Sequence, residues 1–239
     1  MSSREQFITA LNLAKKEGRN FLLEPECDEI LRAYGVPVIE SFFVKTSEEA
    51  AQAAKRLGFP IVEKVVSPDV IHKSDVGGVK INISTEEQAA KSFDEIRESL
   101  KEKMPNARFY GIYMQKMLNG GIETIVGATR DPQFGTVVVF GLGGIFVEVL
   151  KDVSFRVAPI SLDDGMEMIG EIKAAPILNG LRGSKPVDKK ALASVLVASG
   201  KLLLENEEIS SLDLNPVMAL PDKALAVDSR IILRRSKWM

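Results

Sequence analysis

The single histidine of the chain, His72, is followed by residues that could help it carry a phosphoryl group. Lys73 adds positive charge, and Gly77 with Gly78 could turn two successive N–H groups toward a phosphate. Neutral imidazole keeps a nucleophilic lone pair near neutral pH, so it needs only a positioned phosphoryl donor. The pattern therefore predicts a phosphate-handling loop, with an exposed bystander histidine as the alternative.

Two further segments could approach an anionic ligand. Lys64 lies in a strand-like, mostly apolar segment, where a lysine either reaches out from a sheet edge or faces a bound anion. Strand alternation would place Val62 and Lys64 on one face and Glu63 on the other. Gly143 and Gly144 follow another strand-like segment, and they either let the backbone approach a ligand closely or form an ordinary hairpin turn.

Oxygen-bearing side chains near the C-terminus could bind Mg²⁺. In an extended segment Asp213 and Asn215 point to the same face, and the next segment could bring Asp228 beside them. Magnesium takes one or two such protein oxygens and completes its octahedron with phosphate oxygens and water. The alternative is turn chemistry, because Asn-Pro and Pro-Asp sequences favour turns.

Composition limits the function further. The 239 residues are 45% apolar and 27% charged, which is typical of a folded domain. Basic and acidic residues, 31 and 33, give a formal net charge of −2, so no overall positive field attracts nucleic acid or an anionic membrane. The single cysteine, Cys27, allows no intrachain disulfide and suits a reducing cytoplasm. The polar N-terminal run and the apolar segment lengths predict neither a secretory signal nor a membrane span.

The elements that must position these residues follow from hydrophobic periodicity and from capping and turn residues. Helices are predicted over 7–14, 25–35, 47–57, 86–104, 163–173 and 188–205. Strands are predicted over 36–44, 61–66, 79–83, 109–117, 122–128, 135–140, 145–149, 154–160, 211–218 and 224–232. Because strands dominate from residue 108, we expect an α+β chain with a second, more antiparallel sheet and one cleft between the two halves.

Six segments, taken together, resemble the ATP-grasp β subunit of ADP-forming acetyl-CoA (acyl-CoA) synthetases, which are relatives of succinyl-CoA synthetase. The segments are 29–38 (EILRAYGVPV), 59–66 (FPIVEKVV), 72–79 (HKSDVGGV), 127–152 (GATRDPQFGTVVVFGLGGIFVEVLKD), 181–183 (LRG) and 212–217 (LDLNPV). The resemblance extends over about 22–233, and the order and spacing of the segments are more specific than any one of them.

The resemblance implies an ATP-grasp fold in which two α+β subdomains grip the nucleotide in a cleft. Residues 1–21 would form an N-terminal helix, 22–106 the first subdomain with the phosphohistidine loop, and 107–239 the second subdomain with the metal and adenine site.

The resemblance and the residue patterns together give a set of expected site residues. The nucleotide-binding set is Lys64, Lys73, Gly77, Gly78, Gln115, Lys116, Met117, Glu123, Gly143 and Gly144. Within it, the segment 115–117 would run beside adenine. The resemblance implies Mg²⁺ ligation by Asn215 and Asp228. Asp213 stands where succinyl-CoA synthetase has a glutamate that steadies a phosphohistidine, and His72 matches a histidine used as a relay.

The implied reaction converts acyl-CoA, ADP and phosphate into a carboxylic acid, CoA and ATP, through an acyl phosphate and a phosphohistidine. The CoA site and the main phosphohistidine would belong to a separate α subunit, in an α2β2 heterotetramer. Two alternatives stay open. One is an ATP-grasp carboxylate-amine ligase, which forms an acyl phosphate without a phosphohistidine, and the other is a non-catalytic ADP-sensing subunit.

Overall fold

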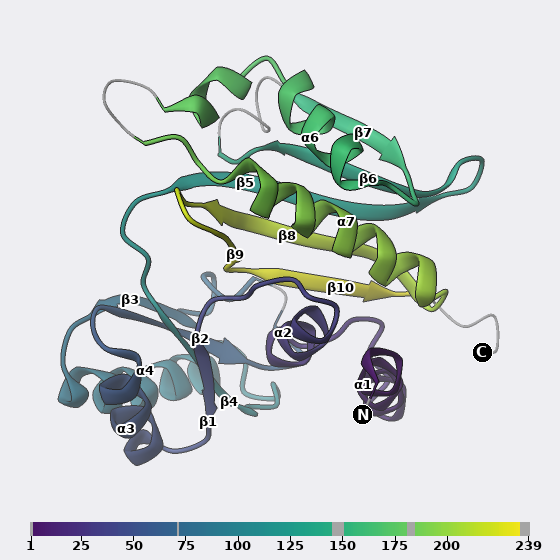
Figure 1. Cartoon of the computed structure of the whole chain (residues 1–239). Helices are drawn as coiled ribbons and strands as arrows, with labels where there is room; N and C mark the ends of the chain where they lie inside the picture. Colours follow the sequence, from purple (N-terminus) through teal and green to yellow (C-terminus); the bar gives the residue numbers. More distant parts are fainter. Residues whose placement is uncertain (1, 71, 145–150, 181–184, 235–239) are drawn as a thin grey trace. The chain divides into compact units, whose positions relative to one another are not determined.

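Helices and antiparallel strands make up the computed structural model, which describes residues 2–70, 72–144, 151–180 and 185–234. The chain divides into two compact units (Figure 1): unit 1 comprises Met1–Leu22, Glu26–Val38 and Gly120–Met239, and unit 2 comprises Leu23–Pro25 and Ile39–Asn119. The expected α+β class is confirmed. The strand expected at 145–149 and the resemblance segment 181–183 lie outside the described residues.

Unit 2 is built on a four-stranded antiparallel sheet with the order β1-β4-β2-β3. Its elements are β1 (Ser41–Val44), α3 (Ser47–Leu57), β2 (Ile61–Val66), β3 (Val79–Ile83), α4 (Glu86–Lys103) and β4 (Gly111–Lys116). The hydroxyls of Thr46 and Thr85 accept hydrogen bonds from the first turns of α3 and α4, which fixes where both helices begin. Phe93 and Ile96 of α4 join Ile61 of β2 in a core in which all three side chains are fully buried.

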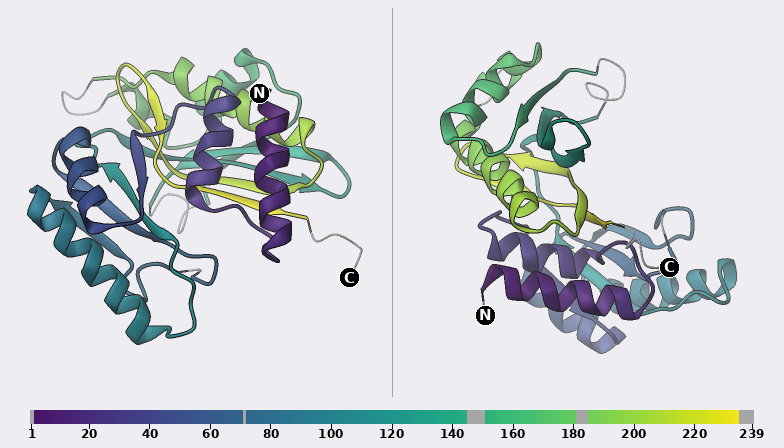
Figure 2. Two further views of the ribbon diagram at one scale, coloured as in Figure 1. Left: turned by 90° about the horizontal axis from the view of Figure 1, so that it is seen from below. Right: turned by 90° about the vertical axis from the view of Figure 1, so that its right-hand side faces the viewer.

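Unit 1 is built on a six-stranded antiparallel sheet with the order β10-β8-β5-β6-β7, and β9 pairs with β8. Its strands are β5 (Ile122–Asp131), β6 (Gly135–Leu142), β7 (Val153–Val157), β8 (Ile209–Ala219), β9 (Ala224–Ala226) and β10 (Ser229–Leu233). Its helices are α1 (Ser3–Lys16), most of α2 (Glu24–Ala33), α6 (Leu162–Glu171), the 3₁₀ helix η1 (Ala175–Asn179) and α7 (Lys189–Glu205). Helix α1 lies beside α2 (Figure 2), where the Ser3 hydroxyl donates to the Ala33 carbonyl at 2.7 Å.

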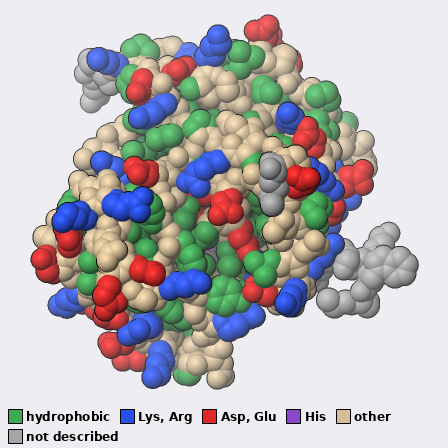
Figure 3. Space-filling model, turned by 60° about the horizontal axis from the view of Figure 1, so that its bottom comes forward, with side chains coloured by type: hydrophobic (Ala, Val, Ile, Leu, Met, Phe, Trp, Pro, Cys, Tyr) green, Lys and Arg blue, Asp and Glu red, His purple; other side chains and the backbone are tan. Residues whose placement is uncertain are grey.

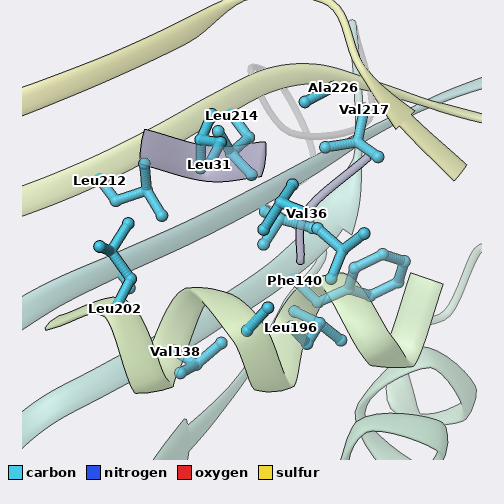
Figure 4. Close-up of a cluster of buried hydrophobic side chains, with 14 of the residues drawn as sticks. Leu31, Val36, Val138, Phe140, Leu196, Leu202, Leu212, Leu214, Val217 and Ala226 are labelled. Atoms are coloured by element: carbon cyan, nitrogen blue, oxygen red, sulfur yellow. The ribbon is translucent and has the colours of Figure 1, made fainter. Parts of the chain in front are cut away.

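Side chains alternate across the unit 1 sheet, so its two faces differ in polarity. Phe140 of β6 and Leu214 of β8 point into the core that Leu196 of α7 also enters (Figure 4). Asp213 and Asn215, which flank Leu214 along β8, are exposed. We call the face that carries Asp213 and Asn215 the polar face of unit 1.

Two expected strands are divided differently in the structure. The strand expected over 36–44 is regular only over β1, and Val38 makes an isolated bridge to Ala226. The single strand expected over 224–232 is instead β9 and β10, separated at residues 227–228. The reason lies in β8, where Pro216 has no N–H to give the ladder and a bulge interrupts the register with β5. The other expected elements in the described residues differ from the observed ones by a few residues at their ends, and η1 was not expected.

The units are bounded differently from the expected subdomains. Strand β4 lies between β1 and β2, so the segment 107–119 belongs with unit 2 although it was expected in the second subdomain. The N-terminal helix is part of unit 1, because Phe7, Leu11 and Ala14 are buried in the core of that unit. The local pattern of predicted helices and strands did not reveal either feature, because both depend on contacts between segments that are distant in the sequence.

The surface carries charges of both signs. Figure 3 shows acidic and basic side chains interspersed over one face, in keeping with the formal net charge of −2. Among the described residues, every helix is too short or too polar to cross a bilayer.

Candidate functional site

Three residues expected to contact nucleotide meet at a carboxylate that the sequence analysis did not single out. The Lys64 ammonium donates to Glu24 Oε1 at 2.6 Å, and the Lys73 ammonium donates to Glu24 Oε2. The Gln115 side-chain amide donates to Glu24 Oε1 at 3.3 Å. We call these four residues the Glu24 cluster. All of them belong to unit 2.

The sheet of unit 2 explains why Lys64 and Gln115 converge. Val62 of β2 is paired with Gln115 of β4 in the antiparallel register, so the two side chains share a face. Lys64, two residues along β2, is on that same face, whereas Glu63 is on the other, as strand alternation predicted. Glu24 opens helix α2, and nothing in its sequence neighbourhood indicates which strand it approaches.

Three members of the Glu24 cluster are buried, Lys73 is half-buried, and the four side chains together carry two positive charges against one negative charge. Glu24, Lys64 and Gln115 are 6%, 9% and 2% exposed. Burial alone would raise the pKa of Glu24, but the ammonium groups of Lys64 and Lys73 outweigh that effect and hold the pKa below its usual value. Two cations and one carboxylate leave a net attraction for an anion such as a phosphate.

His72 is exposed at the start of the turn that leads into β3. Its carbonyl accepts the Asp75 N–H at 3.2 Å, so its backbone is part of the turn while its imidazole stands toward solvent. An exposed ring can be reached by a phosphoryl donor from outside the chain, which a ring buried in the core could not. Lys73, the next residue, binds Glu24, so the histidine directly precedes a member of the Glu24 cluster along the chain.

The phosphate nest expected at Gly77 and Gly78 is not formed, and this part of the sequence interpretation is wrong. The Gly77 N–H donates to the Ser74 carbonyl at 3.0 Å, and the Gly78 N–H donates to the Lys73 carbonyl at 2.8 Å. Both donors are therefore used within the loop. The glycines serve packing instead, because a Cβ on Gly78 would lie 2.4 Å from a methyl carbon of Val65.

The loop that carries His72 is held on both sides. Before it, Asp69 accepts three hydrogen bonds from Arg108, one from the backbone N–H and two from the guanidinium, and this holds the pKa of Asp69 at about 2. After it, the Ser99 hydroxyl donates to the Val76 carbonyl at 2.7 Å. The loop is therefore anchored to Arg108 before His72 and to α4 after it.

The segment expected beside adenine comprises the last two residues of β4 and Met117, which follows the strand. The Lys116 N–H donates to the Glu40 carbonyl at 3.3 Å, and the Met117 N–H donates to the Pro60 carbonyl at 2.9 Å. Neither N–H therefore points to a base. Gln115, the third residue of the segment, joins the Glu24 cluster through its side chain.

Asp213 lies on the polar face of unit 1 between a glycine and an arginine. Its register partners are Gly127 of β5 and Arg230 of β10. Because directly opposed residues share a face, Arg230 flanks the carboxylate on one side and the absent side chain of Gly127 leaves room on the other. Although Asp213 as a whole is exposed, protein atoms around its carboxyl group partly exclude water and raise its pKa, and the positive charge of Arg230 opposes that shift.

The two expected magnesium ligands are neighbours at the bulge of β8. The Asn215 N–H donates to the Asp228 carbonyl at 3.1 Å, so the two backbones run side by side. One amide oxygen and one carboxylate form a donor set that suits Mg²⁺ when phosphate oxygens and water complete the shell. The described residues contain no group of three or more His, Cys, Asp or Glu that could hold a metal without such help.

Glu123 and Gly143 are in contact in unit 1. The Gly143 N–H donates to the Glu123 carbonyl at 2.8 Å, and a Cβ on Gly143 would lie 3.0 Å from the Glu123 Cβ. The glycine thus allows close approach of β5 and the end of β6. Gly144 is exposed with a φ of +61°, a conformation that favours glycine, and it directly precedes residues outside the described part of the chain.

Comparison of the sequence with known proteins identifies close relatives. The family described as an ATP-grasp domain matches residues 13–233. The β subunit of ADP-forming acetate–CoA ligase I from Pyrococcus furiosus is 54% identical over 220 residues, which cover 92% of this chain and 94% of that subunit. The ADP-forming acetate–CoA ligase I of Archaeoglobus fulgidus is 49% identical over 204 residues, which cover 85% of this chain and 30% of that longer protein.

Comparison of the structure points the same way. Acetyl-coenzyme A synthetase 1 of Ca. Korarchaeum cryptofilum, in complex with coenzyme A, Ca-AMPCP and HgCl⁺, matches with a TM-score of 0.91 and 49% identity, covering 98% of this chain and 100% of that chain. A second complex of that protein contains coenzyme A and Mg-AMPPCP and has its phosphohistidine segment pointing towards the nucleotide binding site. It matches with a TM-score of 0.84 and 47% identity, with the same coverage.

Proposed function

The chain belongs to the ATP-grasp domain family and, within it, to the β subunits of ADP-forming acetate–CoA ligases, and from this membership we propose that it is the nucleotide-binding subunit of an ADP-forming acyl-CoA synthetase. The family resemblance and the ATP-grasp fold expected from the sequence are thereby confirmed. The proposed reaction takes acyl-CoA, ADP and phosphate to carboxylic acid, CoA and ATP. Within the chain, the observation that carries the proposal is the convergence of Lys64, Lys73 and Gln115 on Glu24.

The lysines of the Glu24 cluster would bind the phosphates of ADP and ATP. Phosphoryl transfer has a loose transition state whose charge spreads over the phosphoryl oxygens, so fixed cations accelerate it mainly by position and field. Lys64 is held on a rigid strand in the interior, where its charge acts with less screening than in water. Lys73 would act beside it from the loop that carries His72.

His72 would relay the phosphoryl group. One imidazole nitrogen attacks the phosphorus of a donor presented by the partner subunit, forming a P–N bond while the donor's bond to phosphorus breaks. A terminal β-phosphate oxygen of ADP then attacks the same phosphorus, forming a P–O bond as the P–N bond breaks, and ATP results. Asp213 remains a proposed catalytic carboxylate that steadies a phosphohistidine, because a carboxylate bound to one ring nitrogen fixes the orientation of a catalytic histidine.

Asn215 and Asp228 would hold a magnesium ion, which when bound neutralises part of the phosphate charge. Their side chains supply one neutral and one anionic oxygen, so they can orient the ion without cancelling all of its charge. Glu123 and the backbone at Gly143 and Gly144 remain proposed nucleotide contacts in unit 1. Lys116 and Met117 remain proposed contacts in unit 2, through groups other than their N–H donors.

A partner subunit would supply the CoA site. The Pyrococcus furiosus relative is called a β subunit, and the Archaeoglobus fulgidus relative is a longer protein of which this chain matches 30%. We therefore propose a separate α subunit that binds CoA and carries the main phosphohistidine, assembled as α2β2. We also propose a cytoplasmic location, which the single, buried Cys27 supports.

The test is to copurify the native partner and measure ATP formation from acetyl-CoA, ADP and phosphate. The wild-type complex is expected to form ATP, and His72→Ala is expected to abolish ATP formation while ADP binding stays nearly intact, because the ring receives phosphorus but does not hold the nucleotide. Normal turnover by His72→Ala with its partner would end the relay proposal. No turnover by the wild-type complex would favour the ADP-sensing alternative.

Labelling separates the reaction from that of a carboxylate-amine ligase. With γ-labelled ATP, the relay predicts acid-labile, base-stable label on this chain that is lost in His72→Ala. A ligase without a phosphohistidine would place label only on its substrate.

A further inference from the structure

Glu24 is the most deeply placed ionised group of the Glu24 cluster, and the reaction proposed above gives it no part. Its two carboxylate oxygens are divided between two lysines, with Oε1 bound to Lys64 and Oε2 bound to Lys73. Gln115 donates to Oε1 as well, so three side chains of unit 2 are oriented around one carboxylate. Its side chain is 4% exposed, against 11% for Lys64 and 27% for Lys73.

The arrangement is that of a bound anion between two cationic side chains. A carboxylate and a phosphate both accept hydrogen bonds from ammonium groups, with similar charge-assisted geometry. Two lysines brought together without an anion would repel each other and would also be costly to bury. Glu24 removes both costs in the nucleotide-free protein, and the surplus positive charge still attracts phosphate.

We propose that Glu24 is a positioning residue that holds the ammonium groups of Lys64 and Lys73 together before nucleotide binds and competes with the nucleotide phosphates for them. The inference rests on the proposed nucleotide-binding function and extends it to a residue outside the expected site. Phosphate binding then exchanges one set of charge-assisted hydrogen bonds for another, so that nucleotide is held firmly enough to react and loosely enough to leave.

The test replaces the carboxylate with its uncharged isostere in the full chain. Glu24→Gln is expected to bind ADP and inorganic tripolyphosphate about tenfold more tightly, because the lysines lose a competing charged hydrogen bond. Adenosine affinity is expected to stay unchanged, because adenosine lacks phosphates. In the assembled enzyme KM for ADP should fall together with kcat, since the lysines are no longer held in place. If Glu24 only supported the fold, Glu24→Gln would raise KM for ADP instead.

Two variants serve as controls. Glu95→Gln removes the same charge from an exposed ion pair with Lys80 in unit 2, 2.9 Å long, and is expected to leave ADP affinity unchanged. Glu24→Asp keeps the charge, and its ADP affinity should return toward that of the wild type. Calorimetry provides the affinities, and circular dichroism checks that each variant is folded.

If Glu24→Gln alone does not fold, the same substitution can be tested in a chain that also carries Lys73→Gln. Lys73→Gln leaves one lysine against one carboxylate, and adding Glu24→Gln to it restores the surplus positive charge. The double variant is expected to bind tripolyphosphate more tightly than Lys73→Gln alone.

Unchanged or weaker ADP affinity in folded Glu24→Gln, or no gain in the double variant, would overturn the role of Glu24 while leaving the proposed function in place. Failure of the wild-type chain to bind either ADP or tripolyphosphate would overturn both.

Discussion

At the scale of single residues, unit 2 contains two buried glutamates with opposite electrostatics. Glu24 is ionised between two lysines, whereas Glu63, on the other face of β2, is 0% exposed and has the Ser92 hydroxyl as a partner at 2.5 Å. The Oε1 atom of Glu63 has no hydrogen-bond partner among the described residues. Burial raises the pKa of Glu63 to about 7, and the Ser92 hydrogen bond only partly opposes that shift. Glu24 is therefore held ionised, whereas Glu63 keeps its proton until the pH approaches 7.

The neutral state of Glu63 predicts that the chain loses stability as the pH rises. The pKa of the carboxyl group is near 4.5, its ordinary value, in the unfolded chain and about 7 in the folded chain, so between these values the folded state binds more protons and stability falls with pH. The loss should approach about 3 kcal/mol above pH 7, at about 1.4 kcal/mol per pKa unit. Glu63→Gln should remove this dependence, as measured by urea unfolding between pH 5 and pH 8, whereas the exposed Glu98→Gln should not. Parallel pH profiles for Glu63→Gln and the wild type would contradict the neutral assignment.

At the scale of elements, the loop between β2 and β3 is defined by its fixed ends. Its first part is tied to Arg108 through Asp69, and its last part is tied to α4 through the Ser99 hydroxyl. The N–H groups of Gly77 and Gly78 close the turn internally. These hydrogen bonds fix the loop so that Lys73 lies beside Glu24 and His72 is exposed at the surface.

Gly78 should be the most sensitive glycine of this loop. A Cβ there would lie 2.4 Å from a Val65 methyl carbon and 2.8 Å from the Lys73 carbonyl oxygen, so the backbone would have to move. Gly78→Ala is therefore expected to cost about 1–3 kcal/mol in urea unfolding and to lower ADP affinity through displacement of Lys73. Gly170→Ala is the matched control, because a Cβ on that helical glycine meets nothing within 4 Å. Equal stability of Gly78→Ala and the wild type would show that the loop tolerates the added atom.

At the scale of the whole molecule, the expected site residues are divided between two units with separate hydrophobic cores. The Glu24 cluster and His72 belong to unit 2, and Asp213, Asn215 and Asp228 belong to unit 1. The chain crosses between the units four times, and one of these crossings lies within helix α2, between Pro25 and Glu26. Binding measurements therefore need the complete chain, since neither unit contains the whole expected set.

The metal assignment predicts an effect that depends on magnesium. Asp228→Asn should weaken binding of ADP in the presence of Mg²⁺, because the ion loses its anionic protein ligand, and should leave the affinity for ADP unchanged in a chelator. Calorimetry on the complete chain with and without Mg²⁺ measures both values. An equal loss under the two conditions would mean that Asp228 does not act through the metal.

Sequence alone was sufficient for local structure and for family. The spans of α3, β2 and β3 agree with the expected 47–57, 61–66 and 79–83, because capping residues, glycines and β-branched runs act over a few neighbouring positions. The order of the resemblance segments identified the ATP-grasp family, which the comparisons confirm. The same information placed Lys64 and Glu63 on opposite faces of β2, since strand alternation is a local rule.

Only the tertiary structure decided which groups meet. Glu24 was missed because it contacts Lys64 and Gln115, 40 and 91 residues away, and no local pattern encodes such a separation. The nest at Gly77 and Gly78 was expected because glycines permit it, but the folded loop uses both N–H groups itself. Sequence fixes what each residue is able to do, whereas long-range packing determines which hydrogen-bond partner it has.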